Sequence, residues 1–156
     1  MNYLKYTFWL TMMAVGFAFS AWNNAHAQTG KQKPGVIYDA NITRVIDGDT
    51  VAFEAAWLPD PLKKELSIRV FGVDTPEKGH RAQCPKEDVM GQKATEFTKK
   101  AVVSAKKRQV ILMDWDKYGG RVLGDVILDG KSLRQGLIAN GLAREYYGEA
   151  KTSWCN

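Results

Sequence analysis

The 156-residue sequence predicts a single α+β domain, mainly β with two helices. Several short runs alternate apolar with polar residues, as half-buried strands do. One longer run repeats apolar residues at helical steps of three and four, and clusters of Gly, Pro and Asp separate the runs. The chain is long enough for one domain with a substantial core, and two domains would not fit comfortably.

The first 27 residues predict a signal peptide. Lys5 supplies an early positive charge, residues 8–22 are mostly apolar, and Ala25 and Ala27 form an A-x-A cleavage pattern. The alternative is an uncleaved membrane anchor, which needs an apolar run of roughly 18 to 20 residues. Because this run is shorter, we expect cleavage after Ala27, export to the periplasm or the medium, and no stable membrane insertion afterwards.

The segment after the cleavage site predicts a short lead-in and then one domain. Residues 28–35 are polar and contain Gly and Pro, which predicts a flexible lead-in to a domain at 36–156. The formal net charge of the full chain is +5 at pH 7. Modest positive charge is compatible with a polyanionic partner but does not require one.

The first half of the domain predicts three strands, at residues 36–46, 50–57 and 65–73. The Asp-Gly-Asp sequence at 47–49 predicts the turn between the first two. In the third strand Ile68 and Val70 fall on one face, so Arg69 should project from the other.

The second half predicts a helix, two strands and a shorter helix. Met90, Ala94, Phe97, Ala101 and Ala105 recur at helical spacing and define one apolar face. Strand-like runs follow at 109–115 and 121–128, and a second helix contains Leu133, Leu137 and Ile138. Five strands with a helix between the third and fourth indicate a five-stranded Greek-key barrel of the OB type. Periodicity alone leaves other α+β arrangements open.

Cys84 and Cys155 are the only cysteines of the chain. In an exported protein they predict one disulfide, and the alternative is two free thiols. The bridge would close a loop of about 70 residues and stabilise the fold by about 4 kcal/mol. Two cysteines and the one histidine after the leader, His80, cannot form a four-ligand Cys/His zinc site.

Three acidic residues near strand ends are candidates for chemistry: Asp49, Asp74 and Glu77. Each aspartate also has an ordinary explanation as a turn residue. If the fold brings the three carboxylates together, their repulsion must be offset by a proton or a cation. Oxygen donors without sulfur or imidazole suit Ca²⁺ or Mg²⁺.

Arg69 and Arg121 add phosphate-binding capacity, because each carries a planar and permanently charged fork. An isolated surface arginine more commonly pairs with a carboxylate. The sequence contains no Gly-x-Ser-x-Gly elbow and no phosphate-binding P-loop. A metal, two arginines and a spare carboxylate are the groups that phosphodiester hydrolysis needs.

Four motifs resemble the staphylococcal nuclease family in order and approximate spacing: VIDGDTV, RVFGVDTPE, DKYGGRVLG and LRQGLIANGLA. The likeness covers residues 36–147. It implies an OB-fold and a monomeric, Ca²⁺-dependent nuclease that cleaves DNA and RNA with little sequence specificity and leaves 3′-phosphates.

The resemblance also implies roles for individual residues. Asp49 and Asp74 would bind Ca²⁺ through their carboxylates and Thr75 through its backbone carbonyl, while Asp47 would only shape the turn. Glu77 stands at the position of the general base. Arg69 and Arg121 would bind the scissile phosphate. Lys117 and Tyr118 would contact a second phosphate, and Tyr147 or its neighbour Tyr146 would stack on a base.

Two departures and two alternatives accompany this interpretation. DKYGGR has one more glycine than the DKYGR form of the type enzyme, and the chain ends sooner after the second helix. One alternative is a catalytically inactive OB-fold module that binds nucleic acid or a protein. The other is a cationic protein acting on membranes, which would need a basic helix with a broad apolar face. The complete set of Asp49, Arg69, Asp74, Glu77 and Arg121 favours the enzyme.

Overall fold

The computed structural model describes residues 35–62, 64–117 and 119–156. The predicted signal peptide, nearly all of the lead-in and Tyr118 lie outside these ranges. Within them, no helix has both the length and the apolar character needed to cross a bilayer.

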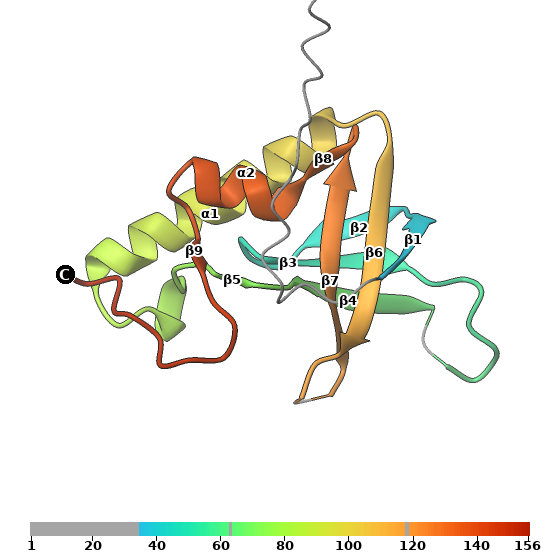
Figure 1. Cartoon of the computed structure of the whole chain (residues 1–156), viewed down its shortest axis with the longest axis horizontal. Helices are drawn as coiled ribbons and strands as arrows, with labels where there is room; N and C mark the ends of the chain where they lie inside the picture. The colour runs from blue at the N-terminus through green and yellow to red at the C-terminus, as the bar shows by residue number, and fades with distance from the viewer. Residues whose placement is uncertain (1–34, 63, 118) are drawn as a thin grey trace, which may run out of the picture.

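A curled sheet forms one side of the domain, and two helices pack beside it (Figure 1). The strands run in the spatial order β1-β6-β7-β4-β3-β2, and β4 and β7 are parallel neighbours. A second, two-stranded sheet pairs β5 with β9. The strands are β1 (Val36–Asp39), β2 (Ile42–Val45), β3 (Thr50–Glu54), β4 (Glu65–Val70), β5 (Val73–Asp74), β6 (Arg108–Trp115), β7 (Arg121–Leu128), β8 (Lys131–Ser132) and β9 (Arg144–Glu145).

The strands at the two edges of the sheet, β1 and β2, come from one continuous segment of the chain. Residues 36–46, expected as a single strand, divide into β1, which pairs with β6, and β2, which pairs with β3. The backbone N–H of Ala40 donates to Arg108, and the carbonyl of Asn41 accepts from Glu54. This bend lets one segment follow both edges, so the sheet curls as an OB-type barrel requires.

The expected third strand is also interrupted, because Gly72 adopts a φ of 77° after Phe71. An added Cβ on Gly72 would lie 3.0 Å from the Arg134 and Tyr147 side chains, so the kink packs closely against the C-terminal part of the chain. The kink separates β4 from β5 and redirects Asp74 towards β9, a pairing that the sequence pattern does not predict.

Helix α1 (Pro85–Ser104) and helix α2 (Leu133–Ala139) correspond to the two predicted helices. Cys84 caps α1, and Pro85 occupies its first turn, where a missing N–H costs little. Most of the predicted apolar face packs against the core, through Ala94, Phe97, Ala101 and Ala105, although Met90 and Phe97 are only partly buried. The buried residues of α1 are Glu87, Gly91, Ala94, Thr95, Thr98 and Val102. Small and polar side chains on this face allow the helix to approach the strand-end loops closely.

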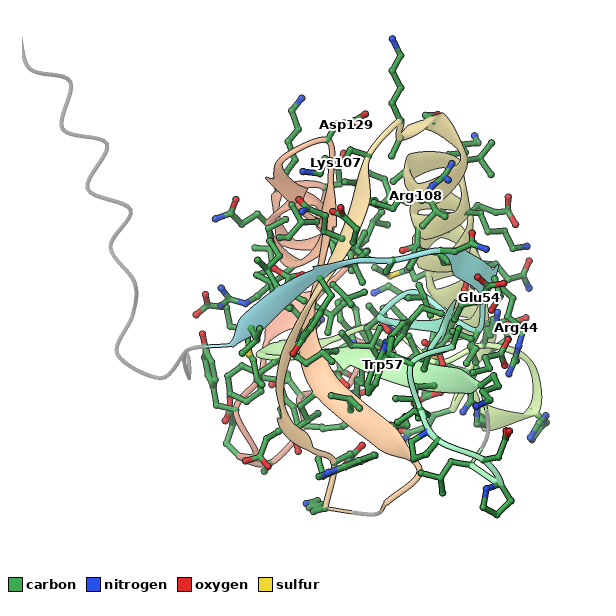
Figure 2. The ribbon with its side chains drawn as sticks, turned by 90° about the vertical axis from the view of Figure 1, so that its right-hand side faces the viewer. Arg44, Glu54, Trp57, Lys107, Arg108 and Asp129 are labelled. Atoms are coloured by element: carbon green, nitrogen blue, oxygen red, sulfur yellow. A yellow bond between two sulfur atoms is a disulfide. The ribbon has the colours of Figure 1, made fainter. Side chains whose placement is uncertain are left out.

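The core lies between the curled sheet and the helices and contains Phe53, Ile68, Val70, Val126 and Leu137. At the far end of the β6–β7 hairpin, Lys107 and Asp129 lie side by side, and the Asp129 carboxylate accepts a 2.7 Å hydrogen bond from the Lys107 backbone (Figure 2).

The predicted disulfide between Cys84 and Cys155 is present, with a Cα–Cα distance of 6.0 Å. It joins the C-terminal segment to the start of α1, where the chain end lies in Figure 1.

Candidate functional site

The turn between β2 and β3 places Asp49 inside the protein. Gly48 lets this turn pack against α1, because an added Cβ would lie 2.7 Å from the Cβ of Ala94. The Gly48 carbonyl also accepts a 2.7 Å hydrogen bond from the Thr98 hydroxyl of α1. Asp49 is therefore held in a fixed position and is only 5% exposed.

Arg69 lies beside Asp49 because β3 and β4 pair in antiparallel register. Its guanidinium is 3.4 Å from the Asp49 carboxylate. Burial would lower the pKa of Arg69, but nearby carboxylates outweigh burial and raise it: Asp49, Asp74, Asp116 and Asp47. One arginine thus serves as counter-charge to a group of acidic side chains drawn from distant parts of the chain.

The pKa of the Asp49 carboxyl group is strongly raised. Burial raises its pKa to about 7; Arg69 opposes the shift and the like charge of Asp47 adds to it. The Thr50 hydroxyl donates a 2.7 Å hydrogen bond to Asp49 Oδ1. Metal-free Asp49 is therefore partly protonated near neutral pH, and a bound cation would favour its ionised form.

Asp74 and Thr75 reach the same region from β5, and both are buried. Asp74 Oδ2 accepts a 3.1 Å hydrogen bond from the Trp154 indole, and the Lys151 ammonium lies 2.5 Å from Oδ1. Among the residues that the structure describes, none donates a well-aligned hydrogen bond to that Oδ1, so the lysine contact is an ion pair alone.

Glu77 is more exposed and lies in the loop before η1 (Gly79–Arg81). The Arg81 guanidinium lies 3.3 Å from the Glu77 carboxylate and 3.4 Å from that of Asp47. The Glu77 backbone N–H donates a 3.3 Å hydrogen bond to buried Glu87 of α1. Arg81 therefore links the predicted general base to the turn that holds Asp49.

Arg121 begins β7 and contacts Asp116 through Nη2 at 2.6 Å and Nε at 2.9 Å. Parallel pairing sets Arg121 opposite Ser67 on β4. Because side chains alternate along a strand, Arg69, two residues beyond Ser67, projects from the same face of the sheet as Arg121. The two predicted phosphate-binding arginines therefore share a face despite the extra glycine in DKYGGR.

A pocket of about 420 Å³ lies next to Arg69. The Tyr147 hydroxyl accepts a 2.6 Å hydrogen bond from Arg134, and its ring meets Phe71 edge-on with centroids 5.8 Å apart, so the ring is held in place. The pocket walls include the predicted substrate residues Lys117 and Tyr147, together with Asp116, Tyr146 and Lys151.

The donor set suits a hard cation. The buried Oδ1 atoms of Asp47 and Asp74 accept no hydrogen bond from the described parts of the chain, and a cation stabilises such oxygens. The predicted calcium ligands, two carboxylates and the Thr75 carbonyl, supply oxygen only.

Glu77 does not join Asp49 and Asp74 in a compact cluster. Among the described residues, three potential metal ligands have their ligand atoms within 4.8 Å of one another: Cys84, Glu87 and Cys155. The two cysteine sulfurs of this group form the disulfide.

Several residues of this region were not predicted as site residues. Asp47 was expected only to shape the turn. Asp116 lies next to Lys117 in the DKYGGR motif, so the motif was an available signal for it. Arg81, Lys151 and Trp154 lie in segments without periodicity, and only the fold brings them to the carboxylates.

Comparison with known proteins identifies the family. The family described as "Staphylococcal nuclease homologue" matches residues 67–154, which include Arg69, Asp74, Glu77 and Arg121. The match begins after Asp49.

Three relatives carry nuclease names. Thermonuclease of Staphylococcus hyicus is 33% identical over 129 residues, covering 82% of this chain and 65% of that protein. Endonuclease YncB of Bacillus subtilis is 31% identical over 138 residues, covering 80% of this chain and 59% of that protein. Endonuclease YhcR of Bacillus subtilis is 33% identical over 119 residues, covering 70% of this chain and 9% of that protein. The chain thus spans less than two thirds of the length of each of these relatives. The family match extends over more than half of the chain, and the chain belongs to the family of staphylococcal nuclease homologues.

Proposed function

We propose that this chain is an exported, monomeric, Ca²⁺-dependent nuclease that hydrolyses DNA and RNA with little sequence specificity. Family membership and the nuclease names of the relatives support this proposal. The disulfide supports export to an oxidising compartment, the periplasm or the medium. The observation that carries the proposal is the position of Arg69. Its guanidinium interacts electrostatically with several carboxylates, and the residue borders the pocket that Lys117 and Tyr147 also line.

Asp49, Asp74 and the Thr75 carbonyl would hold the calcium ion. When bound, Ca²⁺ supplies positive charge that offsets the negative charge of the phosphate and of the transition state. The raised pKa of Asp49 supports this assignment, as does Asp74 Oδ1, which accepts no hydrogen bond from the residues that the structure describes. A bound cation stabilises the ionised form of such buried carboxylates.

Each of the remaining site residues has a separate role in the proposed reaction. Glu77 accepts a proton from water as the water oxygen bonds to phosphorus. The bond from phosphorus to the 5′ oxygen breaks, that oxygen takes a proton from solvent, and the products are a 3′-phosphate and a 5′-hydroxyl. Arg69 and Arg121 donate to the phosphate oxygens as their negative charge grows. The carboxylates of Asp49 and Asp116 orient the two guanidinium groups beforehand.

The test is digestion of long DNA and of RNA by the oxidised protein with Ca²⁺, with Mg²⁺ and with chelator. We expect cleavage that requires Ca²⁺, yields 3′-phosphate ends and falls by about 10²-fold or more in Glu77→Gln. Glu96→Gln is the matched control, since Glu96 pairs with Lys99 on the exposed surface of α1.

A folded wild-type protein that cleaves neither substrate with any of these metal ions would refute the proposal. Retained binding of single strands without cleavage would then identify a nucleic-acid-binding module, the alternative that the sequence leaves open.

A further inference from the structure

The C-terminal segment, residues 151–155, contacts both oxygens of the carboxylate of Asp74, a proposed calcium ligand. The indole Nε1–H of Trp154 donates to Oδ2, and the ammonium of Lys151 lies against Oδ1. Trp154 is 6% exposed and Asp74 5%, so the indole–carboxylate contact is shielded from water. Asp74 precedes Trp154 by 80 residues in the sequence, so only the fold brings them together.

Several independent contacts hold the Trp154 side chain in this position. The Arg144 guanidinium stacks over the Trp154 ring at 3.8 Å from its centroid. The same guanidinium donates to the carbonyls of Thr152 and Ser153 at 3.2 and 2.9 Å. The next residue, Cys155, is bonded to Cys84 at the start of α1. The orientation of the indole is therefore set by the fold and by the disulfide.

The chemistry of the two contacts assigns them opposite effects on a metal ion. Indole is a donor only, so Trp154 occupies Oδ2 and directs Oδ1 towards a cation. Lys151 is itself a cation at Oδ1, where it would compete with a metal ion for the same oxygen. Its side chain is 45% exposed, so it can leave that oxygen without crossing the core.

We propose that Trp154 is a positioning residue for Asp74 and that Lys151 is the counter-ion that the metal ion displaces from Asp74 Oδ1. This inference rests on the proposed function, because it concerns the metal site of that function. It makes the C-terminal segment and its disulfide part of the metal site.

The experiment is calorimetric titration of the oxidised protein with Ca²⁺, which measures affinity without substrate. Trp154→Phe keeps the ring under Arg144 but removes the N–H donor, and we expect about 10-fold weaker binding, as for other partners of metal ligands. Lys151→Met should bind Ca²⁺ about 3-fold or more tightly, because the competing charge is gone.

Matched controls separate these effects from general changes in packing and charge. Trp57→Phe alters a tryptophan that is 61% exposed on the loop after β3 (Figure 2). Lys99→Met removes an exposed lysine paired with Glu96. Neither control should change the Ca²⁺ affinity by more than about twofold.

A measurement on the wild-type protein avoids dependence on a variant that fails to fold. In a ¹⁵N-labelled sample of residues 28–156, the tryptophans are Trp57, Trp115 and Trp154, so Trp57→Phe and Trp115→Phe identify the indole N–H resonance of Trp154 by elimination. That resonance should move on Ca²⁺ titration, and that of Trp57 should not. A stationary Trp154 resonance, or a folded Trp154→Phe with unchanged Ca²⁺ affinity, overturns its positioning role. Unchanged affinity in Lys151→Met overturns the role of the lysine.

Failure of this inference can be told apart from failure of the proposed function. Wild-type protein that binds Ca²⁺ and cleaves DNA, with unchanged affinity in both variants, overturns the inference alone. Wild-type protein that binds no Ca²⁺ overturns the inference and the calcium dependence together.

Discussion

The guanidinium of Arg69 lies 3.4 Å from the carboxylate of Asp49, and neither group is fully hydrated. Asp49 is on the turn before β3 and Arg69 is near the end of β4, so the antiparallel pairing of these strands creates the contact. The same arginine is expected to bind the scissile phosphate, while the same aspartate is expected to bind the metal ion. The free protein thus keeps these two functional charges partly neutralised by each other.

The burial of Asp49 predicts an unusual pH dependence of stability. In metal-free protein the pKa of Asp49 is raised from 3.8 to about 7, so the folded state retains a proton that the unfolded chain releases between these values. The contribution of Asp49 to the free energy of unfolding is therefore greatest below about pH 4 and is lost as the pH rises through about 7, by on the order of 4 kcal/mol.

Urea unfolding with chelator at several pH values between 4 and 8 measures this contribution. Wild type should lose stability relative to Asp49→Asn across the interval, because Asn cannot ionise. Parallel pH profiles for the two proteins would contradict the assignment. Added Ca²⁺ should restore the wild type more at pH 7.5 than at pH 5, since a proton and the ion compete for Asp49.

Arg121→Lys should lower kcat/KM on DNA by about 10²-fold, because lysine keeps the charge but loses the planar fork that binds two phosphate oxygens. Steady-state hydrolysis of a labelled oligonucleotide measures the change. Arg44→Lys is the matched control, since Arg44 pairs with Glu65 at an exposed position on the sheet (Figure 2). Equal activity of Arg121→Lys and wild type would remove Arg121 from the mechanism.

Replacing Tyr147 tests the predicted base-stacking surface. Tyr147→Ala in a Glu77→Gln background should weaken binding of a short single-stranded DNA by about 1 to 3 kcal/mol, the usual value of one stacked base. Tyr147→Phe keeps the ring and loses the hydrogen bond from Arg134, so it should bind nearly as well as the parent. Fluorescence anisotropy measures both affinities, and equal binding by the Ala and Phe variants would show that the ring does not stack.

Loss of the disulfide should lower stability and metal affinity together. Cys84→Ser with Cys155→Ser should reduce the free energy of unfolding by about 4 kcal/mol. The Ca²⁺ affinity should also fall, because the segment that holds Trp154 is no longer joined to α1. Thermal unfolding and calorimetry measure the two effects, and reductant should alter the wild type but not the double variant. Unchanged metal affinity in a folded double variant would show that the segment stays in place without the bridge.

Local sequence patterns were enough to predict the α+β class, the positions of both helices and the pairing of Cys84 with Cys155. They failed where backbone conformation was not periodic. The run at 36–46 was expected as one strand, but it bends at Ala40 and Asn41 to follow two edges of the sheet. The kink at Gly72, which separates β5 from β4, was missed for a similar reason. A glycine with a positive φ does not change the alternation of apolar and polar residues from which strands are predicted.

Motifs in the sequence specified which residue types are available for chemistry: Asp49, Arg69, Asp74, Glu77 and Arg121. Their roles stay predictions until they are tested. The electrostatic environment depended on contacts between distant segments, because charges interact through space rather than along the chain. The raised pKa of Asp49, the Arg81 bridge from Glu77 to Asp47 and the hydrogen bond from Trp154 to Asp74 all arise in this way. A one-dimensional pattern records spacing and polarity, whereas burial and partners exist only once the chain has folded around the site.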